Sequence, residues 1–80
     1  MPTIHSERSY VFHFRAGEVL EEPPHIHVEG EKGNMKVWIP SLEVAYSDLP
    51  NSEEKKILRI VKLHIEKIME VWWDCENKTK

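Results

Sequence analysis

The 80-residue chain has one cysteine, three glycines and no long apolar run. A lone cysteine, Cys75, cannot form an internal disulfide, and this is typical of a protein from a reducing compartment. A membrane-spanning helix needs about 18 or more consecutive apolar residues, and the sequence has no such stretch. The N-terminal residues 1–7 lack the basic start and hydrophobic stretch of a secretion signal. These absences predict a cytoplasmic protein without a membrane span.

Positive charge is also scarce. The 11 lysines and arginines are outnumbered by 14 acidic residues, which gives a formal net charge of −3. Nucleic-acid binding is driven by clustered basic side chains that release counterions, so generic nucleic-acid binding is disfavoured. Apolar residues at 40% and charged residues at 31% fit a globular protein. The length predicts a single domain over residues 1–80 with a modest core.

The first half of the chain has the two-residue period of strands. Residues 30–34 contain two glycines and an asparagine, which can adopt the positive φ values of a hairpin turn. Pro40 donates no ladder hydrogen bond, so it is expected at a strand end or a bulge. The expected strands are residues 10–15, 25–29, 35–39 and, as an optional fourth, 42–46.

The period changes to 3.6 residues after about residue 52. From there to about residue 76, apolar side chains fill one half of a helical wheel and charged ones the other. Asn51 or Ser52 is expected to cap this helix. Leu63 and Trp73 break the pattern by falling on the charged half. The sequence therefore predicts a two-layer α+β fold, in which a three- to four-stranded antiparallel sheet packs on one long C-terminal helix.

A histidine pair follows two prolines in the segment Glu22-Pro23-Pro24-His25-Ile26-His27-Val28. In a strand, His25 and His27 leave one face, about 6.6 Å apart at about 3.3 Å rise per residue, and the intervening aliphatic residues leave the other. Two imidazoles so placed can converge on one metal ion, with nitrogens about 2.0–2.1 Å from zinc. No H-E-x-x-H or C-x-x-C motif accompanies them.

His13 falls on the same face as this pair if Phe12 and Phe14 point to the helix. A divalent metal bound by His13, His25 and His27 is therefore one interpretation, with Glu29 or Glu43 as a source of a carboxylate. The alternative interpretation needs no cofactor, because these histidines can form local hydrogen bonds that hold the Pro-Pro turn against the sheet.

The same outer face would also carry Arg15, Lys36 and Trp38. Arginine and aromatic side chains on an exposed sheet can stack bases or anchor a protein partner. In the alternative, Trp38 covers the edge of the sheet. Trp73 is a further candidate contact, because it lies off the helical stripe.

The order of these pieces resembles a bacterial family, the domain-of-unknown-function 4160 family. The resemblance runs from Met1 to about Trp72, and its most specific part is the segment Pro23-Pro24-His25-Ile26-His27-Val28. It implies no particular activity. The genes of the family often lie beside another small gene, in arrangements resembling toxin–antitoxin modules, so the resemblance implies a protein partner encoded nearby.

Three functions follow as expectations. The first is a small cytoplasmic binding domain, one component of a toxin–antitoxin-like two-protein module. The second is a small His-dependent or metal-dependent hydrolase or nuclease that uses His25 and His27, with His13 assisting. The third is a self-associating module in which Leu63 and Trp73 form the contact.

Overall fold

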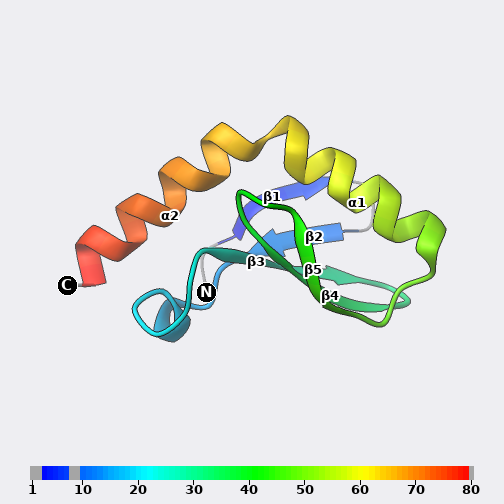
Figure 1. Cartoon of the computed structure of the whole chain (residues 1–80), viewed down its shortest axis with the longest axis horizontal. Helices are drawn as coiled ribbons and strands as arrows, with labels where there is room; N and C mark the ends of the chain where they lie inside the picture. The colour runs from blue at the N-terminus through cyan, green and yellow to red at the C-terminus, as the bar shows by residue number, and fades with distance from the viewer. Residues whose placement is uncertain (1–2, 8–9, 80) are drawn as a thin grey trace.

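The structure, a computed structural model, describes residues 3–7 and 10–79. A five-stranded antiparallel sheet with its strands in sequence order lies beneath two helices (Figure 1). The strands are β1 (Thr3–Glu7), β2 (Tyr10–His13), β3 (His25–Gly30), β4 (Gly33–Trp38) and β5 (Glu43–Ser47). A short 3-10 helix, η1 (Ala16–Glu18), lies between β2 and β3, and the C-terminal helices are α1 (Asn51–Leu63) and α2 (Ile65–Thr79).

The α+β class and the antiparallel sheet are confirmed, and all four expected strands are present. The structure adds β1, which pairs with β2 and lies at the edge of the sheet. No strand was predicted before residue 10, because the preceding residues are mostly polar and have no alternating pattern. β1 is a strand because its backbone forms hydrogen bonds with β2. Such backbone pairing cannot be detected from the spacing of apolar side chains.

The prediction of one long helix was wrong, because the helix is divided at His64. The backbone of His64 leaves helical geometry, with φ −107° and ψ 18°, and α1 ends there. A straight helix over the predicted 25 residues would be about 37 Å long, whereas strands of four to six residues span about 13–20 Å. The bend visible in Figure 1 lets α2 continue at an angle to α1.

The predicted helix cap was also wrong. The N-cap residue is Pro50, in extended geometry, and no side chain caps the helix. Tyr10 instead donates a 2.6 Å hydrogen bond from its hydroxyl group to Glu53 in the first turn of α1. This bond ties the start of the helix to β2.

One face of the sheet forms the core with the helices. Phe12, Val28 and Met35 are paired across β2, β3 and β4, and all three are fully buried. The buried residues of this core on the helices are Ile57, Val61, Ile68 and Trp72. The alternation predicted for β3 is confirmed, because Ile26 and Val28 belong to this core.

Two turns fix the ends of β4. Gly30 pairs with Gly33 to close the β3–β4 hairpin at the predicted turn. A Cβ atom at Gly33 would lie 2.7 Å from the Cβ atom of Asp48, so only glycine fits this approach. Pro40 follows the end of β4, as expected, and its peptide bond to Ile39 is cis. Among the described residues, no helix is both long and apolar enough to cross a membrane.

Candidate functional site

His13, His25 and His27 lie on the face of the sheet opposite the one that carries Phe12, Val28 and Met35. His13 pairs with His27 across β2 and β3, so the two share one face, and His25 follows on the same side of β3. Their exposed fractions are only 1% for His13, 0% for His25 and 3% for His27. The histidines were expected on an exposed outer face of the sheet, and this expectation was wrong. The segment between β2 and β3 folds back, and its η1 helix brings Glu18 onto the histidines.

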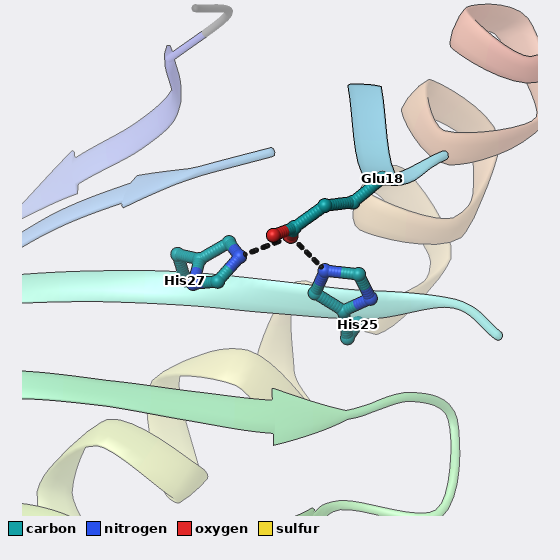
Figure 2. A group of neighbouring side chains, drawn as sticks. All are labelled: Glu18, His25 and His27. Atoms are coloured by element: carbon teal, nitrogen blue, oxygen red, sulfur yellow. Dashed lines mark hydrogen bonds and ion pairs between the residues drawn. The ribbon is translucent and has the colours of Figure 1, made fainter. Parts of the chain in front are cut away.

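Glu18 joins the two histidines of β3 through a single carboxylate oxygen. Its Oε1 atom lies 2.7 Å from Nε2 of His25 and 2.7 Å from Nε2 of His27. Figure 2 shows the carboxylate between the two rings, reached from η1 on one side and from β3 on the other. The rings themselves meet edge to face, with centroids 5.0 Å apart. The chain therefore builds a three-residue centre in this buried part of the sheet, which we call the His–Glu centre (Glu18, His25 and His27).

Hydrogen-bond chemistry fixes where the protons of His25 lie. Its Nδ1 atom is 2.9 Å from the carbonyl oxygen of Pro23, which can only accept, so Nδ1 carries a proton. Its Nε2 atom faces the Glu18 carboxylate, and a second proton must lie between these two atoms. Both ring nitrogens are therefore engaged, and the ring orientation is fixed at both ends.

His27 has only one such contact. A proton lies between its Nε2 atom and Glu18, whereas its buried Nδ1 atom has no hydrogen-bond partner among the described residues. Burial is the main cause that lowers the pKa of His27, and the hydrogen bond to Glu18 opposes this shift. His27 is therefore held neutral at pH 7, with the proton on Nε2.

Glu18 is held as a carboxylate. The hydrogen bond from His27 is the main cause that lowers the pKa of Glu18 to about 2, helped by the hydrogen bond from His25 and opposed by burial. Its second oxygen, Oε2, lies 3.8 Å from the guanidinium group of Arg15. The side chain of Glu18 is 24% exposed, so solvent reaches part of this residue, although the two imidazoles are buried.

Aromatic rings enclose the remaining sides of His25. Trp72 of α2 and Trp38 of β4 contact it at centroid distances of 5.3 and 5.5 Å. Trp38 is partly buried and carries the ammonium group of Lys36 over its ring at 4.6 Å. Lys36 also forms an ion pair with Glu22. Lys36 and Trp38, two of the predicted binding residues, are therefore both held by contacts within the chain. Of the predicted binding residues, only Arg15 and Trp73 are exposed.

His13 lies beside this centre and outside it. Its ring stacks on His27 with centroids 5.6 Å apart, and its Nε2 atom lies 3.3 Å from a carboxylate oxygen of Glu29. The group whose ligand atoms come together consists of Glu18, His25 and His27. The sequence placed His25 and His27 together, but Glu18 was missed, because a loop residue has no period that predicts its direction. The only signal was the presence of three acidic residues, Glu18, Glu21 and Glu22, in the short connection that ends at Pro23-Pro24.

Comparison with known proteins gives one match. A family model described as Domain of unknown function (DUF4160) matches residues 9–73, which is more than half of the chain. No curated protein and no solved structure matches.

Proposed function

Since the chain belongs to the family described as Domain of unknown function (DUF4160), whose description names no activity, we propose its function from its own residues. The protein is a small cytoplasmic bacterial domain that binds a protein partner, as one component of a toxin–antitoxin-like two-protein module. The resemblance supports this pairing, since genes of the family often lie beside another small gene. The acidic balance of the chain fits a protein-binding role better than that of a basic, free ribonuclease.

The observation that carries the proposal is exposed apolar surface on the two helices. Leu63, at the end of α1, is 77% exposed, and Trp73 on α2 is 49% exposed. Tryptophan is enriched among interface hot spots, which are worth about 2 kcal/mol or more on truncation. Beside Trp73 in sequence, a shallow open hollow is lined by Glu70, Val71 and Asp74. Asp74 is already paired with Lys78 of the same helix, so the indole and the carboxylate of Glu70 suit a partner that offers an apolar side chain beside a lysine or arginine.

Co-purification tests this proposal. The tagged protein is expressed together with the product of the adjacent gene, and the complex is measured by pull-down and by light scattering after size exclusion. Trp73→Ala is expected to weaken the complex at least tenfold while the domain stays folded, and Lys62→Ala, a matched exposed position on α1, is expected to leave it unchanged. A dimer of the isolated protein that Trp73→Ala disrupts would identify a second copy of the chain as the partner. A monomer that retains no partner would refute the proposal.

A second candidate function is a His-dependent or metal-dependent hydrolase or nuclease. The observation that favours it is the His–Glu centre, where an ionised and partly exposed carboxylate contacts two imidazoles. Carboxylate and imidazole groups at hydrogen-bond distance are the usual general acids and bases of hydrolysis. Cleavage of RNA and of chromogenic phosphodiesters by the protein, with loss of activity in Glu18→Gln, is the expected result. Equal turnover by the protein and Glu18→Gln would show that the activity comes from elsewhere.

A further inference from the structure

We propose that Glu18, His25 and His27 bind one divalent transition-metal ion of the zinc, nickel and cobalt class. The third ligand is then Glu18 of the loop, in place of His13 on the neighbouring strand. This inference goes beyond the binding of a protein partner, since it concerns the buried His–Glu centre and not the exposed residues Leu63 and Trp73 of the helices. It also stands whether or not the centre hydrolyses a substrate.

The spacing of the donor atoms fits a small ion. One ligand atom from each of the three residues lies within 4.8 Å of the others. In a tetrahedral zinc site with bonds of about 2.0–2.1 Å, neighbouring ligand atoms are about 3.3 Å apart. The two 2.7 Å contacts to Glu18 must open by about half an ångström, and the two imidazole nitrogens must approach each other by at most about 1.5 Å. Rotations of the side chains supply such movements. The Nε2 atoms must also lose their protons when the ion binds: that of His25 is released to solvent, and that of His27 is exchanged for one on Nδ1, so binding releases one proton in all.

His25 already has the orientation of a metal ligand. Histidines that bind metals usually donate the other ring N–H to a carbonyl or a carboxylate, which fixes the tautomer and the ring. The Nδ1–H group of His25 donates to the carbonyl oxygen of Pro23 and directs Nε2 toward Glu18. Because Pro23 precedes a second proline, the backbone that carries this carbonyl group is stiff.

The donor set selects the class of metal. Two imidazole nitrogens and one carboxylate oxygen suit zinc, nickel, cobalt and iron(II), whereas calcium and magnesium prefer oxygen ligands throughout. Three protein ligands leave at least one coordination position open, as in catalytic rather than structural zinc sites. An ion can enter from the exposed side of Glu18, where Arg15 is the neighbouring cation, 3.8 Å from Oε2. Lys36, the other cation of this face, is held by Glu22.

Titration with zinc chloride, nickel chloride and cobalt chloride tests the inference. Calorimetry on the purified protein is expected to give one site per chain with a micromolar or tighter dissociation constant. Bound cobalt is expected to show visible absorption of a low-coordinate site, which reports the ligands independently of heat. Glu18→Gln keeps an acceptor oxygen but loses the ligand charge, so it is expected to weaken binding at least tenfold, and His27→Gln is expected to do the same.

His13→Gln is the matched control. His13 is buried on the same face and contacts His27, yet it is absent from the group, so affinity is expected to stay within about threefold. Circular dichroism of each variant reports folding, and if His27→Gln unfolds, the partly exposed position Glu18 still decides the question. The inference is overturned if the folded protein binds none of the three ions at millimolar concentration. It is also overturned if Glu18→Gln binds as tightly as the parent, or if His13→Gln loses the ion while Glu18→Gln retains it.

Discussion

Among the residues that the structure describes, Glu18 is the hydrogen-bond acceptor of two buried ring nitrogens, so replacing it with alanine would remove both contacts at once. Nε2 of His25 and Nε2 of His27 both donate to its Oε1 atom at 2.7 Å. The two imidazoles are 0% and 3% exposed, so solvent does not reach them while η1 stays in place. Glu18 belongs to neither α1, α2 nor the apolar core, so the cost of its replacement reports mainly on the centre.

The size of this cost follows from the two lost hydrogen bonds. A buried donor left without a partner costs about 1–3 kcal/mol, so the two together would cost about 2–6 kcal/mol. The shorter side chain also admits water from the side on which Glu18 is exposed, which reduces the cost to about 2–4 kcal/mol. A chain of this length has a free energy of unfolding of about 4–12 kcal/mol. We therefore expect Glu18→Ala to remain folded but to lose a large part of its stability.

Urea unfolding followed by tryptophan fluorescence measures this loss, since Trp38 and Trp72 both contact His25. Glu21→Ala is the control, because Glu21 is exposed in the same connection, and its effect should stay within about 0.5 kcal/mol. Glu18→Gln should fall between the two, since its amide oxygen still accepts a hydrogen bond. A loss below about 0.5 kcal/mol in Glu18→Ala would refute the reasoning, because it would mean that the imidazoles find other partners.

Three further predictions concern the core, pH and charge. Ile68→Ala, at a position 1% exposed, should lower the free energy of unfolding by about 2–5 kcal/mol in urea titrations, whereas Leu63→Ala should change it by less than about 0.5 kcal/mol. The pKa of Glu18 is lowered from 4.5 to about 2 and that of His27 is lowered below 6.5, so at these two groups the folded protein binds fewer protons than the unfolded chain. Its melting temperature should therefore be highest above pH 6.5 and fall as the pH drops toward 2, and Glu18→Gln should flatten the part of this fall below pH 4.5. Arg15→Gln removes a half-exposed cation beside Glu18, so calorimetry should show metal binding tightened by about two- to threefold, and unchanged or weaker binding would contradict the role given to this charge.

The sheet and its orientation were predictable because local patterns determine them. Alternation in β3 assigned Ile26 and Val28 to the core and His25 and His27 to the other face. The glycines of the β3–β4 turn then fixed the pairing of these two strands. Alternation and turn residues are patterns among neighbours in sequence. A shift of the strand pairing by one residue would move the apolar side chains of a strand to the opposite face of the sheet.

The division of the C-terminal helix was not predictable in the same way. The apolar stripe runs through His64 without interruption, and neither glycine nor proline marks the position. The helix ends there in the folded protein, whose short strands offer less length than a straight helix of 25 residues would need. Tertiary fit of this kind outweighs helix propensity and leaves no trace in the period.

The cover of the histidines was missed for a related reason. Periodicity could say which face His25 and His27 take, but not what lies above that face. Glu18 belongs to a connection of irregular structure, and only the path of the backbone from β2 to β3 decides where its carboxylate points. The sequence therefore predicted His13 of the sheet as the third metal ligand. It did not reveal that Glu18 contacts both rings.

The His–Glu centre is costly for so small a domain, and this cost bears on function. Imidazole and carboxylate groups lose hydration when they are buried, and replacing buried ionic groups with apolar residues of similar volume is often neutral or stabilising. On the other face of β3, Ile26 and Val28 are buried at no such cost. A centre that binds an ion or moves a proton gives a physical reason to keep two histidines and a carboxylate where aliphatic side chains would pack as well. A triple replacement of Glu18, His25 and His27 by leucine separates these roles, since a variant that folds as stably as the parent but binds no metal would show that the centre serves chemistry rather than stability.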